Sequence, residues 1–305
     1  MKKIVLLAFL SVLLSTAVVV GFIRPVVTQG TIYIRDNGSV DPPTANISSV
    51  DNITYTFTGN NYDEVVVERD NIVVDGAGYA LRGIGAPESR GIFLSGKSNV
   101  TIKNMKIKSF AYGIWLNRSS NNSIYGNNIT NNIGGILLTY SSNNSIFGNN
   151  ITNQYYGIAL PDSSNNIIYH NNFVDNTEQV YSYNSTNVWD DGYPSGGNYW
   201  SHYTNVDQYR GPYQNVTGSD GIWDYPYVID ENNQDNYPIV PEFPTWASML
   251  FILIVLTVVI VIYRRRLKKH HSTKNSENLS GSPIFVNLVS SLGADALVPR
   301  RFLRL

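Results

Sequence analysis

The stretch from Gly113 to Asn176 repeats one pattern three times. It reads GIWLNRSSNNSIYGNNITNN from Gly113, GILLTYSSNNSIFGNNITNQ from Gly135 and GIALPDSSNNIIYHNNFVDN from Gly157. The three glycines are 22 residues apart, and the Ser-Ser-Asn-Asn block keeps the same spacing. A repeat of this length is typical of a solenoid, in which each repeat forms one coil.

Each repeat predicts short strands separated by turns. Apolar and polar residues alternate over short runs, and Ser, Asn and Gly divide these runs. Ile114 and Leu116 therefore lie on one face of a strand and Trp115 on the other. One repeat offers about three strands but too few inward residues for a core of its own, so the coils must stack, roughly 4.8 Å apart.

We expect an all-β fold, a parallel β-helix spanning residues 31–176. Its coil of about 22 residues and three strands resembles the right-handed, pectate-lyase-like architecture. A leucine-rich repeat has a similar period, but it needs a Leu-x-x-Leu-x-Leu ladder that this sequence lacks. Gly91 and the three repeat glycines begin four regular coils, and residues 65–81 suggest a more divergent first coil.

Stacked coils also stack their asparagines. A buried amide is tolerated when its donors and acceptors are paired, and a ladder pairs each amide with the next. The spacing predicts two such ladders, one of Asn122, Asn144 and Asn166 and one of Asn127, Asn149 and Asn171. We interpret these asparagines as structural.

The two ends of the sequence are apolar. Lys2, Lys3 and the apolar run that follows predict a secretory signal peptide over residues 1–23, although the run is also long enough for an uncleaved anchor. Near the other end, the uncharged residues 246–263 predict a transmembrane helix, and the basic residues 264–305 after it predict a cytoplasmic tail. The β-helix is then expected on the outer side.

Residues 177–240 no longer follow the repeat and are rich in aromatic residues and aspartate, which predicts a C-terminal cap. Residues 24–240 hold 11 Lys and Arg against 20 Asp and Glu, a net charge of −9, which argues against nucleic acid as a partner. From residue 264 onward nine basic residues face two acidic ones, a net charge of +7, which suits a membrane surface. Cysteine is absent, so no disulfide supports the fold.

Two resemblances follow from these motifs. The repeats, with Gly197-Asn-Tyr-Trp and Gly221-Ile-Trp-Asp-Tyr-Pro-Tyr in the cap, resemble the NosD-type β-helix family, also called periplasmic copper-binding β-helix proteins, over about residues 31–238. Pro241-Glu-Phe-Pro, the apolar span and the arginine cluster resemble the archaeal PEF-type sorting signal. This second resemblance implies an archaeal surface protein and a membrane transpeptidase, an archaeosortase, as partner, but the tail continues 39 residues past Arg266.

Metal ligands are sparse in the sequence. Copper prefers thiolate, thioether or clustered imidazole ligands, and residues 24–240 offer only Met105, His170 and His202, so we expect no copper site. Calcium prefers carboxylate oxygens, and the cap either binds calcium or carries a solvated acidic surface. The six cap aspartates in question are Asp190, Asp191, Asp220, Asp224, Asp230 and Asp235.

Catalysis has little support in the repeats. Between Gly113 and Asn176 the charged residues are Arg118, Asp162 and Asp175, and no strand carries the carboxylate pair that sugar hydrolysis requires. We therefore expect no catalytic residue and a non-catalytic role at the cell surface, either binding glycans or building the envelope. The alternative is a polysaccharide lyase or hydrolase of the pectate-lyase-like class.

Aromatic residues are the candidate glycan-binding side chains. Outward positions 22 residues apart hold Tyr125, Phe147 and Tyr169, and Trp115 with Phe93 begins a second outward column. The alternative is that these rings stack to hold the coils together. Eleven Asn-x-Ser/Thr sequons precede residue 241, and those we expect to accept glycans are Asn37, Asn46, Asn52, Asn99, Asn117, Asn121, Asn143 and Asn215.

Overall fold

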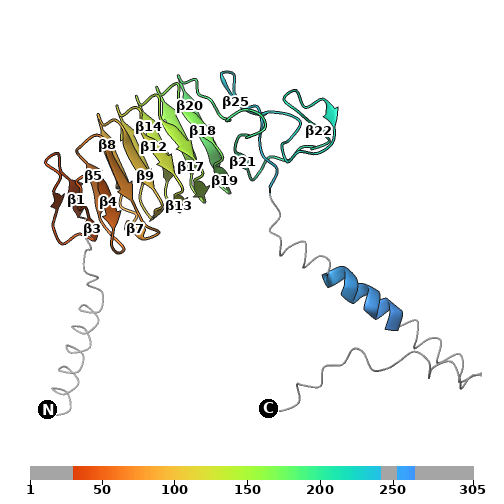
Figure 1. Cartoon of the computed structure of the whole chain (residues 1–305), viewed down its shortest axis with the longest axis horizontal. Coiled ribbons are helices and arrows are strands. Elements are labelled where there is room, and N and C mark those ends of the chain that lie inside the picture. Colours follow the sequence, from red (N-terminus) through yellow and green to blue (C-terminus); the bar gives the residue numbers. More distant parts are fainter. Residues whose placement is uncertain (1–29, 242–252, 265–305) are drawn as a thin grey trace, which may run out of the picture. The chain divides into compact units, whose positions relative to one another are not determined.

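The computed structural model describes residues 30–241 and 253–264, which belong to two separate units divided after Pro241. The first unit is a parallel β-helix built from three sheets (Figure 1). This confirms the all-β solenoid with coils of about 22 residues. The right-handed winding stays a prediction.

Each regular coil contributes one strand to each sheet, and the antiparallel strands β2 and β3 extend sheets A and B at one edge. Sheet A contains β2 (Val40–Asp41), β1 (Thr31–Ile34), β5 (Glu64–Val67), β8 (Arg90–Ser95), β11 (Tyr112–Asn117), β14 (Gly134–Thr139), β17 (Tyr156–Pro161) and β20 (Glu178–Tyr183). Sheet B contains β3 (Ile47–Ser48), β4 (Thr54–Phe57), β6 (Ile72–Asp75), β9 (Val100–Lys103), β12 (Ser123–Tyr125), β15 (Ser145–Phe147) and β18 (Ile167–Tyr169). Sheet C contains β7 (Ala80–Arg82), β10 (Lys106–Lys108), β13 (Asn128–Thr130), β16 (Asn150–Thr152), β19 (Asn172–Val174) and β21 (Tyr199–Trp200).

Columns of identical apolar residues fill the core. In sheet A the register places Ile92, Ile114, Ile136 and Ile158 side by side, and all four are fully buried. Sheets B and C repeat this with Ile124 beside Ile146 and with Ile129 beside Ile151. A solenoid buries its apolar surface between coils, so the repeat alone determines the core.

The repeat glycines are required by close approach between coils. A Cβ added to Gly113 would lie 2.6 Å from the carbonyl oxygen of Gly135, and one added to Gly135 would lie 2.5 Å from that of Gly157. Real Cβ atoms do not approach an oxygen this closely, so the column accepts only glycine.

Both predicted amide ladders are present. Asn122 Nδ2 donates to Asn144 Oδ1 at 3.0 Å, and Asn144 Nδ2 donates to Asn166 Oδ1 at the same distance. The second ladder runs from Asn127 to Asn149 at 3.0 Å and on to the next coil at 2.9 Å. The ladder amides are at most 2% exposed, and each also donates to a backbone carbonyl of the preceding coil, as Asn127 does to Ile102 at 3.1 Å.

The solenoid is longer than the repeat. β1 and β4 add a parallel coil before the divergent one, and β20 and β21 continue sheets A and C past residue 176. Our boundary at residue 176 therefore falls inside the stack of coils. Parallel pairing depends on the backbone, so β20 pairs with β17 although its sequence, EQVYSY, lacks the Gly-Ile-x-Leu pattern.

The remainder of residues 177–240 forms loops and two small hairpins. These hairpins pair β22 (Tyr209–Arg210) with β23 (Val216–Thr217), and β24 (Tyr227–Asp230) with β25 (Asn233–Asp235). Trp189 and Trp200 are buried against the β24–β25 hairpin and join the core of the solenoid. The cap expected at this end thus packs on the last coil.

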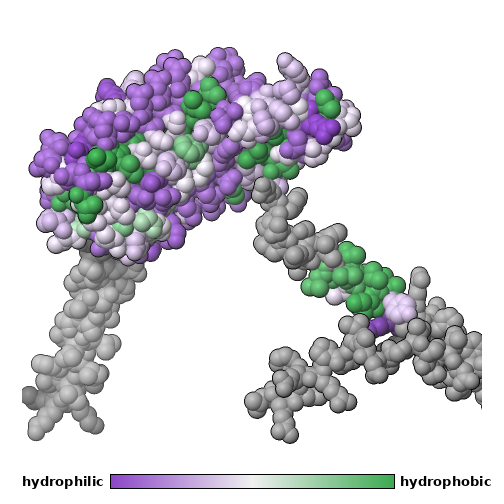
Figure 2. Space-filling model, in the orientation of Figure 1, coloured by the Kyte–Doolittle hydropathy of each residue, from purple (hydrophilic) through white to green (hydrophobic). Residues whose placement is uncertain are grey.

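The second unit contributes residues 253–264, which form an exposed apolar helix, coloured green in Figure 2 apart from its last turn. Within the residues that the structure describes, no helix is long and apolar enough to cross a membrane. The expected signal peptide over 1–23, the first part of the span over 246–263 and nearly all of the tail over 264–305 lie outside the described residues.

Candidate functional site

Tyr125, Phe147 and Tyr169 lie on the outer face of sheet B, in β12, β15 and β18. Their rings are stacked, with centroids 4.9 Å and 5.2 Å apart and interplanar angles of 13° and 10°. The flat faces therefore contact one another, and all three side chains are half-buried. This is the geometry of a ladder that holds coils together, and it leaves mainly ring edges for a ligand.

The two ends of this stack are also covered. Tyr125 pairs in register with Lys103, and the ring of Tyr169 lies at an angle of 67° to that of His170, with the two centroids 5.1 Å apart. Burial raises the pKa of the Tyr169 hydroxyl. We call Tyr125, Phe147 and Tyr169 the sheet B stack. It is better suited to holding the coils together than to binding a ligand.

Trp115 lies on a different face, the outer side of sheet A. Its ring contacts Phe93 edge-on at 5.4 Å and Tyr112 at 5.3 Å, while the Arg90 guanidinium lies 3.9 Å from the Phe93 centroid. The indole Nε1 donates to Thr139 on the next coil at 3.3 Å, which directs the indole toward β14. The structure therefore separates Trp115 from the other three predicted residues.

A second aromatic group lies farther along sheet A and is absent from our sequence prediction. Tyr155 and Tyr156 meet edge to face at 4.6 Å, and Tyr156 lies 5.5 Å from Tyr181, which is 41% exposed. The signal was present, because Tyr156 and Tyr181 fall at the positions of Tyr112 and Trp115 in later coils. In the sequence the outward column of Phe93 and Trp115 fades to Leu137 and Ala159, and its aromatic continuation at Tyr181 lies beyond the recognisable repeat.

Small and aliphatic residues connect the two aromatic groups. The register places Trp115, Leu137, Ala159 and Tyr181 in one line across four neighbouring strands. Gly134, beside Tyr112, has no side chain at all. We call this line, with the two aromatic groups at its ends, the sheet A strip.

Carboxylates near the sheet A strip are not arranged for hydrolysis. Glu64 pairs with Arg90 at 2.6 Å, and burial raises the pKa of Glu64 although that arginine opposes the shift. Sheet A carries two further strand carboxylates. Asp41 on β2 is paired with Arg35, and Glu178 on β20 is separated from Glu64 on β5 by four strands. Because neighbouring strands lie roughly 4.8 Å apart, Glu64 and Glu178 are much farther apart than the two carboxylates of a sugar hydrolase, which are separated by about 5 to 10 Å.

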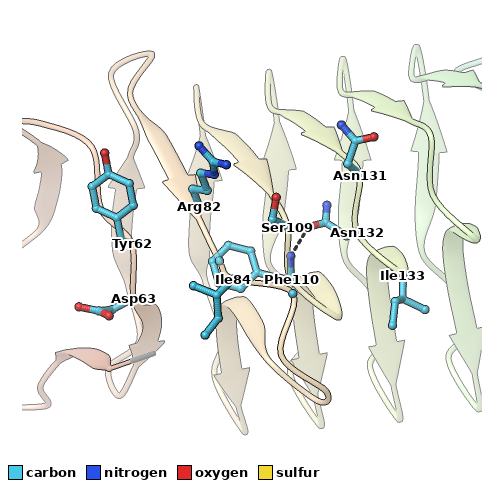
Figure 3. A pocket seen from close by; sticks show the side chains of 11 residues that line it. Tyr62, Asp63, Arg82, Ile84, Ser109, Phe110, Asn131, Asn132 and Ile133 are labelled. Carbon is cyan, nitrogen blue, oxygen red and sulfur yellow. Dashed lines mark hydrogen bonds between the residues drawn. The ribbon is translucent and has the colours of Figure 1, made fainter. Parts of the chain in front are cut away.

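A groove of about 780 Å³ lies where sheet C turns toward sheet A (Figure 3). Its apolar lining includes Tyr62, Ile84 and Ile133, which are 60%, 49% and 55% exposed. Arg82 and Asn131 add polar groups to the lining. No residue of this groove was among our sequence predictions.

A protein-family model described as periplasmic copper-binding protein (NosD) matches residues 26–205, more than half of the chain. The chain belongs to the NosD family. No curated protein and no solved structure matches it significantly. The family's periplasmic description agrees with our expectation that the β-helix of this NosD chain lies outside the cytoplasm.

The copper in the family's description finds no clustered ligands among the residues that the structure describes. In residues 30–241 and 253–264, no three His, Cys, Asp or Glu side chains gather as a metal site would require. Both nitrogens of His202 lie near other groups, 2.8 Å from Gln179 Nε2 and 3.0 Å from the Tyr227 hydroxyl. Met105 is buried in the core, so these donors do not fit a copper centre.

A Ser-His-Asp set in this NosD chain does not form a catalytic triad. Ser195 Oγ donates to Asp191 at 3.0 Å and lies 3.3 Å from His170 Nε2. In a triad the carboxylate holds the imidazole, whereas here it holds the serine. His170 Nε2 is also 2.7 Å from the carbonyl oxygen of Ser195, to which it can only donate.

The cap aspartates mainly hold loops together. Asp224 accepts from the backbone N–H groups of Gln208 and Tyr209 at 3.0 Å each, and Asp207 accepts from those of Asp220 and Gly221 at 3.1 Å. Carboxylates engaged in this way support the cap directly. Calcium binding by these residues stays a prediction.

The predicted glycosylation sites are accessible in all but one case. Asn117 is half-buried on β11, whereas the other seven are exposed. Asn121 and Asn143 occupy turns with φ near +58°, a conformation that asparagine tolerates better than most residues. Attachment at these turns would not disturb the core.

Proposed function

We propose that this NosD-family chain is a non-catalytic β-helix protein that binds a glycan along the sheet A strip. The observation that carries this proposal is the line from Trp115 through Leu137 and Ala159 to Tyr181, with an aromatic group at each end. It crosses four coils and runs along the axis of the solenoid. A glycan chain lying in this direction contacts several coils at once.

The chemistry of the strip suits pyranose rings. The C–H faces of a sugar pack against aromatic side chains, and the small side chains between the two groups leave room for the chain to lie close to the sheet. Coils roughly 4.8 Å apart repeat at nearly the length of one sugar unit, so successive units meet equivalent positions. Asn117 and Thr139, paired in register beside Trp115, offer hydrogen bonds to hydroxyl groups.

The positions of the carboxylates favour glycan binding over glycan cleavage. Hydrolysis needs two of them close together and available, whereas on sheet A Asp41 is paired with Arg35 and four strands separate Glu64 from Glu178. Glu64 is also committed to Arg90. The proposal therefore places recognition, without bond cleavage, on this face.

The proposed location is the outer side of the cell membrane. The signal peptide over 1–23 delivers the chain, and the apolar span over 246–263 anchors it with the basic tail inside. An archaeosortase acting near Pro241 would provide an alternative to a permanent span. The rod-like solenoid would then face glycans of the cell envelope or of the surroundings.

The test uses the full-length chain and a panel of neutral polysaccharides, with binding and release of shortened chains measured in the same samples. We expect binding without release, and a loss of binding in Trp115→Ala and in Tyr181→Ala. Tyr213→Ala is the matched control, because Tyr213 is 83% exposed in the cap, away from the strip. Release of fragments would replace this proposal with the lyase or hydrolase alternative.

A further inference from the structure

The outer face of sheet C carries three positive charges and no negative charge. Arg82 and Lys108 are directly paired in register on β7 and β10, and Lys106 precedes them on the same face. The other outward residues of β7, β10, β13, β16 and β19 are alanine, asparagine, threonine and valine. We call Arg82, Lys106 and Lys108 the basic triplet.

This concentration of charge contrasts with the rest of the solenoid. Residues 30–241 contain ten Lys and Arg against twenty Asp and Glu. In that part of the chain the ion pairs involve Arg35, Arg90 and Lys103, so no member of the basic triplet has a carboxylate partner. Like charges placed directly opposite on a sheet are destabilising, and Arg82 faces Lys108 without compensation.

The basic triplet borders the groove. Arg82 lines it, and the bridge between Asn61 and Leu81 places Tyr62 beside Arg82 in the next coil. Figure 3 shows Tyr62, Arg82 and Asn131 pointing to the same side of the groove. Asp63 points away from Arg82 in this view and accepts from the Gly30 N–H at 2.8 Å.

Neutral polar groups extend the face beyond the charges. Lys108 is followed in register by Thr130 and Thr152, and Lys106 by Asn128 and Asn150. Among these side chains the single hydrogen bond is a long one, 3.4 Å from Asn150 Nδ2 to Asn128 Oδ1. Their remaining donors and acceptors are free for a hydroxylated ligand.

We propose that the groove and the basic triplet form a second binding site, which takes an anionic glycan whose carboxylate or sulfate groups contact Arg82, Lys106 and Lys108. A sugar ring of this ligand packs on Tyr62, and its hydroxyl groups reach Asn131 and the threonines of sheet C. The inference rests on the proposed function only in that both ligands are glycans. The two sites occupy different sheets and need not bind the same chain.

A glycan fits this face better than the other polyanions. Three cations on a solenoid of net negative charge attract a single flexible chain with spaced charges. A nucleic acid duplex or a lipid surface would extend over the neighbouring carboxylates and be repelled by them. The exposed tyrosine and the free amides also favour sugar rings.

The test measures affinities of the full-length chain for polygalacturonate, dextran sulfate and neutral dextran, with duplex DNA and phosphatidylglycerol vesicles as competing polyanions. The variants are Arg82→Gln alone and Arg82→Gln combined with Lys106→Gln and Lys108→Gln. Lys97→Gln is the matched control, because it removes one positive charge that lies outside sheet C. All substitutions are at the surface, and thermal melting verifies that each variant folds.

We expect one or both anionic glycans to bind more tightly than neutral dextran, and the triple variant to bind roughly tenfold more weakly. Binding should also weaken between low and moderate salt, because exposed charges are screened. The relative affinities for polygalacturonate and dextran sulfate assign the carboxylate or the sulfate as the ligand group. The single variant should show a smaller loss, and Lys97→Gln should bind like the wild type.

Equal binding by the wild type and the triple variant would overturn the inference. It would also be overturned if the triple variant lost as much affinity for DNA or vesicles as for the anionic glycans, whereas binding through the apolar span and the basic tail is the same in both proteins. Failure of the sheet A proposal would be seen in different samples. Neutral glycans would then not bind, or they would bind Trp115→Ala as tightly as the wild type. A triple variant that keeps neutral-glycan binding but loses anionic-glycan binding separates the two sites directly.

Discussion

Asn233 and Asp235 close the two amide ladders of the solenoid in the same way. Asn233 Oδ1 accepts from the Asn187 N–H at 2.9 Å and from the Trp189 indole at 3.1 Å. Asp235 Oδ2 accepts from the Asn198 N–H at 2.7 Å and from the Trp200 indole at 2.9 Å. β25 thus supplies backbone and indole donors of the last coil with the acceptors that a further coil would have provided, while Asn187 Nδ2 stays without a hydrogen-bond partner.

The buried carboxylate predicts a pH effect on stability. Burial raises the pKa of Asp235 to about 7, although hydrogen bonds from Asn198, Trp200 and Tyr237 oppose the shift. Because the pKa in the folded state lies above the unfolded value, this group stabilises the fold fully below about pH 4, and the contribution is lost as the pH rises through about 7. The full effect is on the order of 4 kcal/mol.

Urea unfolding of the wild type and of Asp235→Asn, from about pH 4 to about pH 8, measures the contribution of Asp235 to the free energy of unfolding. We expect the wild type to lose stability relative to the variant as the pH rises. Asp162→Asn, at a half-buried position on the outside of the solenoid, should follow the wild type. Parallel curves for wild type and Asp235→Asn would mean that this carboxylate keeps the same charge over the whole range.

The amide ladders predict an asymmetry between neighbouring asparagines. Asn149→Ala removes the acceptor of Asn127 N at 3.1 Å and one of the acceptors of Asn127 Nδ2 at 3.0 Å, and it leaves the buried backbone N–H of Asn127 unpaired. We expect the free energy of unfolding to fall by about 3 kcal/mol, since each unpaired buried group costs roughly 1 to 3 kcal/mol. Asn150→Ala, which changes the next residue and loses one long hydrogen bond, should cost far less. Similar losses for the two variants would argue against a ladder.

The glycine column predicts a steric effect. An added methyl group at Gly135 would meet Gly157 O at 2.5 Å and Ile151 at 2.9 Å, so Gly135→Ala must push neighbouring coils apart. Overpacking of this kind costs about 1 to 3 kcal/mol. Gly59→Ala is the control, because its nearest contact is the exposed Asn46 side chain at 3.2 Å. Chemical denaturation should show a lower midpoint for Gly135→Ala only.

The sheet B stack predicts that stability and binding can be separated. Phe147→Ala removes the middle ring between Tyr125 and Tyr169, and we expect a loss of about 2 kcal/mol in stability. Glycan binding by the folded variant should be unchanged, because the sheet A strip is intact. A binding loss in this variant, measured below its melting temperature, would show instead that the stack contacts the ligand.

Regular parts of the fold could be predicted because each coil repeats its neighbour. The spacing of Asn122 and Asn144 alone was enough to predict their contact, and the same holds for the stacked Tyr125 and Phe147. The cap was different, because Asn233 reaches Asn187 from 46 residues away with no repeated motif to indicate it. The outlying coil of β20 was missed for the same reason.

The candidate sites were harder to predict than the coils. Trp115 was predicted to bind a glycan, but the ring that completes its line, Tyr181, lies where the repeat is no longer recognisable. Arg82 and Lys108 are 26 residues apart, since the turn between them is longer than in later coils, and only the register makes them neighbours. Surface function in a solenoid therefore depends on irregular coils that the period does not reveal.

The most direct test of the central proposal is a structure of the full-length chain with a neutral oligosaccharide identified in the binding panel. We predict an uncleaved sugar chain lying along sheet A from Trp115 to Tyr181, with its rings against the two aromatic groups. A ligand bound elsewhere, or a cleaved product on sheet A, would contradict the proposal.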